Sequence, residues 1–479
     1  MKRYFFTKKV LLKAILINLT CLFFLISCEQ NLSSDQPHIA TADTVKWDIN
    51  YPGSRDYHIS FKLKKGANVG TDAFPGAKQT LYFSNKNFVF EDKNFPFYSD
   101  TIINVQKGDE NYEVKVRFNG ISCFFPKEYR QKHNQGILIE IPEVYELANI
   151  LWVLSQEGKY SQTLPKNTDY ISEVEQYFTP YLKHPIFEKL QVPDSLYFTK
   201  YYEFRENSFT FQFDGDKLVR NGPFYFVYGE DRRNFTSFFT ELKTLVEDFA
   251  KTSNYRQFYQ SHKSYYDSLV REQAEMIPVR NIWDWMEREF PNNSYQAYRV
   301  VFSPLIGGSH STQNFSTFDE TIDDWFSESV MFVCGNRYAS DKSLSREQMK
   351  GLMSGVFLTE VDHNYVNSAS RKYREDIDSI FENREQWAND QVISYQSQMA
   401  VFNEYMTHAV YSLWVLENFD QKTANFLIDH REKLNIKRGF IKFPEFNQAL
   451  IKISKENPDK KTIELYPDIL EWCKTTESS

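Results

Sequence analysis

The stretch TEVDHNYVN at residues 359–367 places a carboxylate and an imidazole, Glu360 and His363, about one helical turn apart. A capping pair, Ser345 with Gln348, predicts the start of a helix before them. Apolar residues then recur at helical spacing, namely Met349, Leu352, Met353, Val356 and Phe357. Extending this stripe turn by turn reaches Glu360 and then His363. Because an unpaired buried charge is costly, a carboxylate on such a stripe indicates a partner, a metal ion or a cleft.

Asp362 lies between these two residues. On one continuous helix its side chain points about 100° away from that of His363. An Asp beside a His can orient the imidazole by accepting a hydrogen bond from its other ring nitrogen, but the sequence favours a solvent-facing Asp362 here.

The same stretch resembles the helix of zinc metallopeptidases of the zincin type, with one change. In the pattern H-E-x-x-H, two His one turn apart bind zinc and the Glu acts as general base. Glu360 and His363 stand where that Glu and the second His belong, and Thr359 takes the place of the first His. A Thr hydroxyl is a poor zinc ligand, so either another residue completes the site or the metal is lost.

A second segment, Tyr395 to Leu416, offers candidates for the missing ligand. Glu404 is its only formally charged residue and His408 its only His, and most other side chains are apolar or small. Apolar character on most sides predicts a helix buried nearly all round. Glu404 and His408 are four residues apart and share a face. We expect Glu404 to supply a metal ligand and His408 to replace the absent first His.

The N-terminus has the features of a bacterial lipoprotein signal. Residues 1–27 hold five Lys and Arg and no acidic residue, with a mostly apolar run from Val10 to Ile26. Leu25-Ile26-Ser27-Cys28 resembles the lipobox, in which the Cys is lipidated and becomes the first mature residue. The next residues lack the Asp that typically retains lipoproteins in the inner membrane. We therefore expect an outer-membrane lipoprotein anchored at Cys28, with the side it faces left open.

Chain length and net charge limit the number of domains and the classes of function to consider. The 479 residues suffice for two or three domains, and the net charge of −8 argues against general nucleic-acid binding. We expect a tether at 28–44, a small β-sandwich-like domain at 45–135 and a mainly helical zincin-like domain at 136–479, an α+β fold overall. The strands expected in the first domain are Tyr57–Leu63, Gln79–Phe83, Thr101–Val105 and Tyr112–Phe118.

Within the second domain, strands are expected at Tyr298–Phe302 and Val330–Cys334. The aromatic segment Tyr197–Phe213 is a candidate for ligand binding, but aromatic alternation more often indicates a half-buried strand, which we expect here. His310, in the loop after a glycine pair, is a minor candidate for a substrate contact, although a loop His is more often solvated. The three Cys after Cys28 lack metal-binding spacing and are expected to be small buried residues.

From about Glu140 onward the chain resembles a bacterial family of secreted or lipid-anchored proteins, catalogued as a domain of unknown function with a zincin-like metallopeptidase signature. The matching pieces are PEVYELA at 142–148, SPLIGG at 303–308, EVDHNYVN at 360–367 and Asn403-Glu404. The resemblance implies Glu360 as the base and His363 and Glu404 as metal ligands. The sequence departs from the family pattern at Thr359 and at Ser368, where the family has His and Pro.

Two hypotheses follow. The first is a zincin-like peptidase, in which His363, Glu404 and His408 hold zinc and Glu360 takes the proton of the attacking water. A Glu/His set also suits iron or manganese. The second is a non-catalytic descendant that keeps the fold and binds a peptide, a glycan or another envelope protein. Thr359 favours the second hypothesis, and the retained Glu360, His363 and Glu404 favour the first.

Replacing Cys28 with Ala should release the protein from the membrane fraction or block its maturation, because the thiol is the only point of lipid attachment that the signal predicts. Cell fractionation and mass spectrometry of the N-terminus measure this. A mature wild-type protein that still carries Met1 to Ser27 would contradict the prediction.

Overall fold

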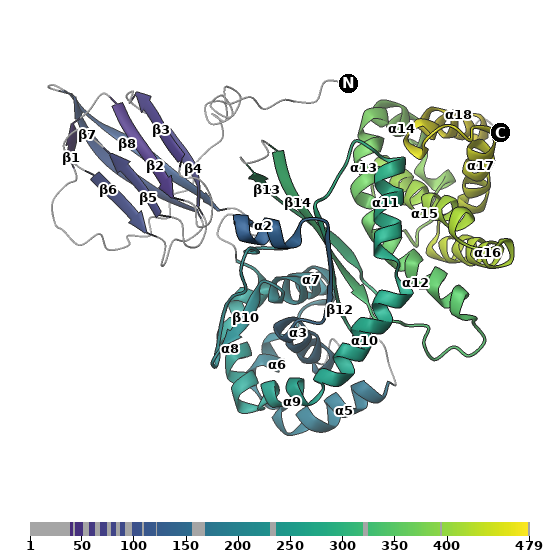
Figure 1. Ribbon diagram of the computed structural model, residues 1–479, viewed down its shortest axis with the longest axis horizontal. Helices are drawn as coiled ribbons and strands as arrows, with labels where there is room; N and C mark the ends of the chain where they lie inside the picture. Colours follow the sequence, from purple (N-terminus) through teal and green to yellow (C-terminus); the bar gives the residue numbers. More distant parts are fainter. Residues whose placement is uncertain are drawn as a thin grey trace. The chain divides into compact units, whose positions relative to one another are not determined.

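The chain forms two compact units in the computed structural model. The first comprises Met1–Glu128 with Pro223–Ser237, and the second Tyr129–Gly222 with Phe238–Ser479. The structure describes the backbone of strands between Ile39 and Gly120, and then residues 122–155, 168–229, 236–319, 324–392 and 395–477 (Figure 1). The signal segment with Cys28 lies outside the described residues.

The first unit contains two four-stranded sheets. One has the order β1-β7-β8-β4, formed by Ile39–Thr41, Tyr98–Lys107, Glu110–Gly120 and Asn68–Ala73. The other has the order β3-β2-β5-β6, formed by Tyr57–Lys62, Thr44–Asn50, Lys78–Tyr82 and Asn87–Glu91. The β-rich character expected for this region, with strands at β3, β5, β7 and β8, is confirmed.

The second unit is built on a mixed four-stranded sheet with the order β13-β14-β12-β9. These strands are Ser311–Asp319, Asp324–Cys334, Ala297–Ser303 and Gly136–Glu140. Strands β9, β12 and β14 are mutually parallel, and β13 runs antiparallel to β14 at the edge. Every residue of β12 is buried, as expected for an interior parallel strand covered on both faces. The two strands predicted here are confirmed as β12 and β14.

Helices precede and interrupt this sheet. They are α2 (Lys127–His133), α3 (Glu143–Leu154), α5 (Asp169–Phe178), α6 (Pro185–Lys189), α7 (Tyr197–Ser208), α8 (Phe238–Thr252), α9 (Tyr255–Ser261), α10 (Lys263–Met276) and α11 (Val279–Glu289), with the 3-10 turns Thr179–Tyr181 and Asp194–Leu196. A hairpin of β10 (Phe211–Asp214) and β11 (Lys217–Arg220) follows α7.

The prediction of a strand over Tyr197–Phe213 is wrong for most of that segment. Tyr197–Ser208 is helix α7, and only Phe211–Asp214 is a strand. The aromatic residues that suggested alternation also fit helical spacing. Tyr201 and Phe204 are buried on one face of α7, where the Trp152 ring of α3 lies 5.3 Å and 5.9 Å from their rings. Packing on Trp152 therefore outweighed the β propensity of the aromatic side chains.

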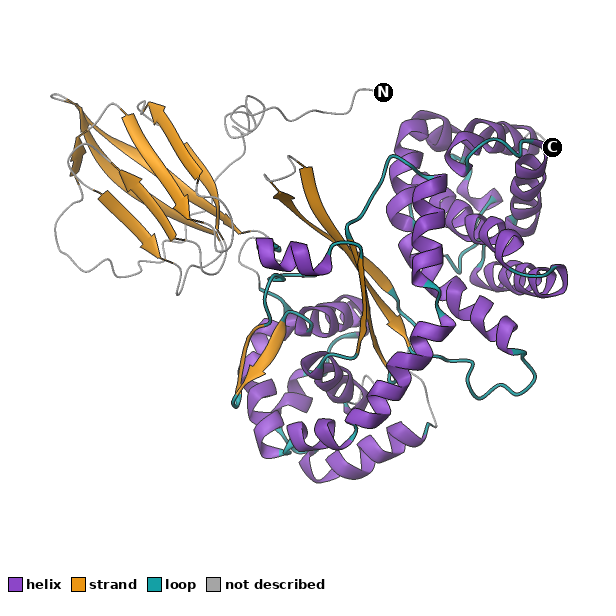
Figure 2. Ribbon diagram, in the orientation of Figure 1, coloured by secondary structure: helices purple, strands orange, loops and turns teal. Residues whose placement is uncertain are grey.

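The described residues of the C-terminal part of the second unit form helices joined by loops, with one isolated β-bridge between Ala388 and Phe440 (Figure 2). Its helices are α12 (Arg346–Val361), α13 (His363–Ser370), α14 (Arg374–Ile380), α15 (Gln398–Asn418), α16 (Gln421–Arg438), α17 (Phe443–Glu456) and α18 (Tyr466–Glu477), with 3-10 turns at Arg371–Tyr373, Arg384–Gln386 and Thr462–Leu465. Helix α15 packs against α12, α13, α14, α16 and α17. Residues 404–415 of α15 are all buried, which confirms the prediction of a helix buried nearly all round.

Helix α12 approaches its neighbours closely because two glycines lie on one of its faces. A Cβ at Gly351 would lie 2.2 Å from Leu427 Cδ1 of α16, and one at Gly355 would lie 2.1 Å from Arg431 Nη2. Both separations are far below van der Waals contact. Gly351 and Gly355 are four residues apart and so face the same way. Space for α16, rather than an unusual backbone angle, is what requires glycine at these positions.

The fold is thus mixed α/β with a helical C-terminal region, in agreement with the α+β expectation at this level. Cys123, Cys334 and Cys473 are free and buried, as predicted. No helix in the described ranges combines the length and hydropathy needed to cross a bilayer.

Replacing Gly351 with Val should destabilise the protein by about 2 kcal/mol, because the added methyl groups collide with Leu427 in a packed core. The matched control is Glu347→Val, one turn earlier on an exposed part of α12, with an expected change below about 1 kcal/mol. Urea unfolding of both variants measures the difference. Equal stabilities would contradict the close packing of α12 on α16.

Candidate functional site

Helix α12 begins as the sequence predicts and ends earlier. The Ser345 side chain accepts from Gln348 N at 3.2 Å, and Gln348 Oε1 accepts from Ser345 N at 2.9 Å, which completes the capping box. The helix stops at Val361, Asp362 forms a turn, and α13 starts at His363. Glu360 and His363 therefore lie on two consecutive helices, so the expected single stripe is interrupted between them.

Asp362 does not face solvent, so that prediction is wrong. Its side chain is fully buried, and neither carboxylate oxygen has a hydrogen-bond partner among the described residues. Burial raises its pKa well above the usual range, which keeps the carboxyl group neutral. Asp362 keeps helical backbone angles, φ −70° and ψ −18°, and the face of the helix on which its side chain lies is buried, whereas the 100° argument assumed that this face meets solvent.

The first turn of α13 is anchored to the sheet. Asn364 Nδ2 donates to Ser329 Oγ of β14 at 3.0 Å and to Thr312 Oγ1 of β13 at 3.3 Å. Asn293 Nδ2 in turn donates to the Asn364 carbonyl at 2.7 Å. These contacts hold the residue next to His363 and so set where the imidazole lies.

The structure brings His363, Glu404 and His408 together. His363 Nε2 lies 3.3 Å from Glu404 Oε1, and His408 Nε2 lies 3.5 Å from Glu404 Oε2. Glu404 and His408 are buried, whereas His363 is partly exposed. The side chains expected to converge from two segments therefore do meet, with the Glu404 carboxylate at their centre.

Two arginines that the sequence analysis did not single out complete this group. Arg438, the last residue of α16, donates from Nη2 to Glu404 Oε2 at 2.6 Å, and its Nη1 contacts His408 Nε2. Arg431, two turns earlier, lies with Nη1 3.0 Å from His408 Nδ1. We call these five residues, His363, Glu404, His408, Arg431 and Arg438, the Glu404 cluster.

Two weak features of the sequence relate to these arginines. Arg431, Asn435 and Arg438 are spaced to share one face of α16, and Gly355 of α12 leaves the space that the Arg431 guanidinium fills. Among the many charged residues of α16, nothing local marks these two as buried. Their role follows only from the packing of α16 on α12 and α15.

Charge compensation determines the protonation states in the cluster. Burial alone would raise the pKa of Glu404, but the contacts with His363, His408 and Arg438 hold it well below its usual range. Burial and the two nearby guanidinium groups lower the pKa of His408 to about 3. For His363, burial lowers the pKa but the carboxylates around it prevail and raise it to about 9. At neutral pH Glu404 is therefore an anion, His363 a cation and His408 neutral.

Glu360 lies at the partly exposed edge of the cluster. Burial raises its pKa to about 7, with the neighbouring Glu404 adding to the effect and His363 and Arg438 opposing it. Such a carboxyl group exchanges protons near neutral pH, as a general base must. Position and protonation thus suit the role expected of Glu360, provided that a reacting water has a place beside it.

Thr359 does not turn toward the cluster. Its Oγ1 donates to the Gly355 carbonyl of its own helix at 2.8 Å. His310 is half-buried, and its Nε2 is shielded from water without a hydrogen-bond partner among the described residues. Burial and the charges of Arg337 and Arg205 lower the pKa of His310 to about 3, so it is a neutral imidazole outside the Glu404 cluster.

The residues present do not fit a zinc ion. Three protein ligands and an open position for water are needed, with ring nitrogens free to bind. Both ring nitrogens of His408 contact guanidinium groups, and the Glu404 oxygen facing His408 is bonded to Arg438. No group of three or more His, Cys, Asp or Glu side chains within the described ranges is placed to hold a metal ion.

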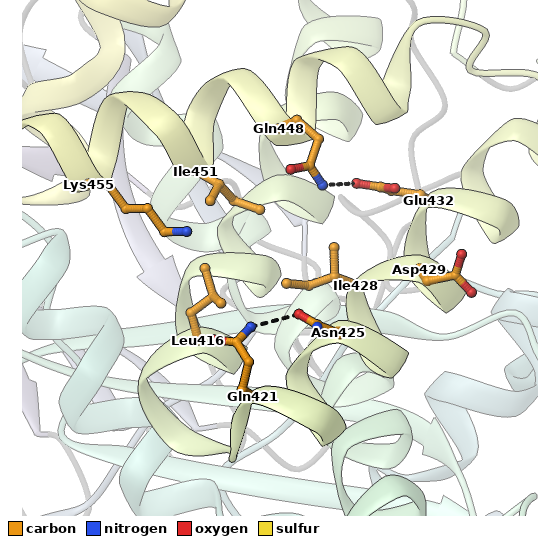
Figure 3. Close-up of a pocket in the computed structure, with 9 residues that line it drawn as sticks. All are labelled: Leu416, Gln421, Asn425, Ile428, Asp429, Glu432, Gln448, Ile451 and Lys455. Carbon is orange, nitrogen blue, oxygen red and sulfur yellow. Dashed lines mark hydrogen bonds between the residues drawn. The ribbon is translucent and has the colours of Figure 1, made fainter.

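A shallow groove lies elsewhere on the helical region, between α16, α17 and the end of α15. Its volume is about 210 Å³, and its lining is Leu416, Gln421, Asn425, Ile428, Asp429, Glu432, Gln448, Ile451 and Lys455 (Figure 3). Side-chain hydrogen bonds at 2.7 Å, from Gln448 to Glu432 and from Gln421 to Asn425, occupy several of its polar groups. None of the residues of the Glu404 cluster lines it.

Three comparisons with known proteins found no match. No family model matches the chain, and neither a curated protein nor a solved structure shows a significant match.

Replacing Glu360 with Gln should flatten the pH dependence of stability between about pH 4.5 and 7. A pKa raised from 4.5 to about 7 means that the folded state holds this proton more tightly than the unfolded chain. Wild-type stability then falls as pH rises through this window, by at most about 3 kcal/mol, whereas Gln cannot ionise. The unfolding free energy of the variant minus that of wild type should therefore increase with pH.

Urea unfolding at pH 5 and pH 7.5 measures this difference. The control is Glu347→Gln, at an exposed position of the same helix, whose difference from wild type should be the same at both pH values. If the Glu360→Gln difference also stays constant, the carboxyl group does not titrate near neutral pH.

Proposed function

We propose that this protein is a bacterial outer-membrane lipoprotein, anchored through Cys28, with a β-sandwich-like N-terminal domain and a zincin-like helical domain. The signal segment and lipobox support the anchor. The order Glu360, His363, Glu404 along the chain, and the proximity of His363 to Glu404 at 3.3 Å, support descent from a zincin. The side of the membrane that the protein faces is left open by this proposal.

We further propose that the helical domain has lost zinc peptidase chemistry and serves in binding. The observation that carries this proposal is the position of Arg438, which bonds Glu404 and contacts His408 where a zincin needs free ligands. Thr359, in place of the first ligand, is bonded to its own helix. A peptidase would need a Lewis acid to polarise the scissile carbonyl, and the side chains here provide an internal ion pair instead.

Three ionisable side chains lie at the partly exposed edge of the cluster, namely Glu360, His363 and Arg438. Together they present both signs of charge within a small area. Such an edge suits a peptide or protein segment of the cell envelope that carries charges of both signs, because charge complementarity selects the partner and its register. The alternative, an active zinc peptidase, rests on the retention of Glu360, His363 and Glu404.

The full chain, purified from membranes in detergent, should contain less than about 0.1 zinc per molecule and leave a peptide library uncut. Elemental analysis and mass spectrometry of the library measure these quantities. Stoichiometric zinc together with peptide cleavage that Glu360→Gln removes would establish the peptidase instead, because the carboxylate is required for proton transfer.

If the edge binds peptides, replacing His363 with Ala should weaken the binding of envelope-derived charged peptides at least about tenfold, in line with the loss of a charged contact of 1.4 kcal/mol or more. Fluorescence anisotropy with labelled peptides measures the affinity. The control is Glu347→Ala, on an exposed part of α12, which should bind as wild type does. Unchanged affinity of the His363→Ala variant would refute this edge as the binding surface.

A further inference from the structure

Arg431 of α16 is a buried cation without an ion-pair partner among the described residues. It is 6% exposed, and burial lowers the pKa of its guanidinium group with no carboxylate to oppose the effect. Its Nε has no hydrogen-bond partner, and its Nη1 lies 3.0 Å from Nδ1 of His408, a neutral imidazole that Arg438 also contacts. The Tyr411 ring, centred 4.4 Å from the guanidinium carbon, attracts the cation without neutralising its charge.

The acidic groups around Arg431 leave its charge unbalanced. Burial holds the pKa of Asp362 well above its usual range, against the charges of His363 and Arg431, so this carboxyl group stays neutral. The Glu404 carboxylate is an anion, but it bonds Arg438 at 2.6 Å and lies 3.3 Å from the cationic His363. At neutral pH the Glu404 cluster therefore holds three cations and one anion. This surplus of positive charge attracts anions to the surface above it.

A second arginine without an ion pair lies near Arg431. Arg337, three residues after β14, is exposed and pairs with no carboxylate in the parts of the chain that the structure describes. Its guanidinium carbon lies 5.6 Å from the centre of the Tyr338 ring. Burial raises the pKa of Tyr338, and the charges of Arg337 and Arg431 oppose this rise. Burial lowers the pKa of His430, and the same two charges add to the effect. Both guanidinium groups therefore lie close to Tyr338 and His430.

Arg337 also lies near the edge that we propose binds peptides. Burial raises the pKa of the Cys334 thiol to about 11, and the charges of Arg337 and Glu360 act on this thiol with opposite signs. Cys334 is the last residue of β14, and Glu360 lies in the last turn of α12. A ligand held at Glu360, His363 and Arg438 can therefore extend toward Arg337.

We infer that Arg337, with the buried charge of Arg431 beneath it, forms a binding site for a carboxylate group of the peptide ligand. The inference rests on the proposed binding function and names the chemical group that the ligand must carry. A guanidinium group suits this role, because two parallel N–H donors match the two oxygens of a carboxylate. The C-terminus of a peptide and an Asp or Glu side chain both supply this group.

Arg431 contributes through its charge rather than through contact. Its Nε is shielded from water, so the ligand meets Arg337 at the surface. Charges interact more strongly in the protein interior than in water, so a buried cation beneath the site strengthens the binding of an anion. The exposed Asp429 of α16 does not cancel this charge, because it pairs with Lys433 at 2.6 Å. Glu360, with a pKa of about 7, is partly ionised at neutral pH and repels a doubly charged phosphate more than a carboxylate.

The test measures the affinity of the full chain in detergent for labelled, envelope-derived charged peptides by fluorescence anisotropy. In one set, each peptide is paired with the same sequence ending in an amide instead of a carboxylate. In a second set, it is paired with a version in which Asn and Gln replace Asp and Glu. Wild type should bind the carboxylate-bearing member at least about tenfold more tightly in one set, which identifies the source of the carboxylate. Arg337→Ala should remove this preference. Arg337→Lys should retain part of it, because Lys keeps the charge but lacks the paired donors.

Two controls locate the site and identify its ligand. Lys342→Ala removes a positive charge from an exposed position of the same segment and should keep the wild-type preference. Inorganic phosphate, added at constant ionic strength, should displace the carboxylate-bearing peptide no better than acetate does.

The variant Arg431→Met tests the buried charge. It should reduce the preference for the carboxylate about threefold, although the Arg431 side chain does not contact the peptide. Without a ligand, the melting temperature of this variant should equal or exceed that of wild type, because an unneutralised buried charge is removed. The matched variant Arg438→Met should melt several degrees below wild type, because it removes the cation bonded to Glu404.

The outcomes separate the inference from the proposed function. A wild type without preference for the carboxylate, or a preference that survives Arg337→Ala, overturns the inference, whereas binding lost in His363→Ala still supports the proposed edge. Phosphate that displaces the peptide better than acetate does overturns the carboxylate assignment. An Arg431→Met variant that melts as low as Arg438→Met overturns the role of Arg431 as an unneutralised charge. Wild type that binds no peptide of either set overturns both proposals.

Discussion

The buried carboxylate of Glu404 is the constraint around which the helical domain is arranged. An anion in the centre of a helical core is tolerated only with a close cation. Arg438 meets this need at 2.6 Å, and His363 lies on the other oxygen at 3.3 Å. The last residue of α16, Arg438, and the first residue of α13, His363, therefore both lie where their side chains reach Glu404 of α15. The break at Asp362 and the glycine end of α16 are both consistent with this requirement.

The second arginine shows how closely the surrounding helices are adapted. A neutral imidazole offers one acceptor nitrogen, so His408 accepts a hydrogen bond from only one of the two guanidinium groups beside it. Arg438 has Glu404 as its main partner. Arg431 lies over the Tyr411 ring, 4.4 Å from its centre, and against Gly355, where any larger residue would displace it. The cluster thus holds two guanidinium cations in addition to the His363 cation around the ionised Glu404 carboxylate, with an aromatic ring and neutral acceptors completing the surroundings of the guanidinium groups.

This arrangement bears on how a hydrolytic site can become a binding site. The proposed ancestor has a metal that carries charge and activates water. A guanidinium group supplies the positive charge that the buried carboxylate needs, but it has no open coordination position at which a water could be activated. It can therefore stabilise the fold without supporting hydrolysis. Glu360 keeps a pKa of about 7, which fits a residue retained from a proton-transfer role. On this proposal the protein keeps the shape and edge charges of a peptidase cleft for recognition.

Much of the local structure followed from sequence pattern alone. The capping pair at Ser345, the strands β12 and β14, the buried helix around Glu404 and His408 and the burial of the three later cysteines were all predictable, because each depends on periodicity or on neighbours within a few residues. The helix over Tyr197–Ser208 was missed because aromatic residues fit strands and helices equally well, and contact with Trp152 decided between them. The burial of Asp362 was missed because helical spacing gives the direction of a side chain but does not say whether the rest of the domain covers that face.

What the sequence determined by itself is the set of chemical groups: two carboxylates and two imidazoles on two helical segments, and a Thr where a zincin has a ligand. Only the tertiary structure decided which cations contact the carboxylate of Glu404 and the imidazole of His408. Arg431 and Arg438 are two among many charged residues of α16, and no local pattern distinguishes a solvated arginine from one inserted beside a buried carboxylate. That choice depends on the packing of α16 against α12 and α15, which brings residues 23 and 34 positions apart to within hydrogen-bonding distance. Hydrogen bonds over such separations are made only once the helices have packed, so sequence pattern supplied the groups and packing supplied their partners.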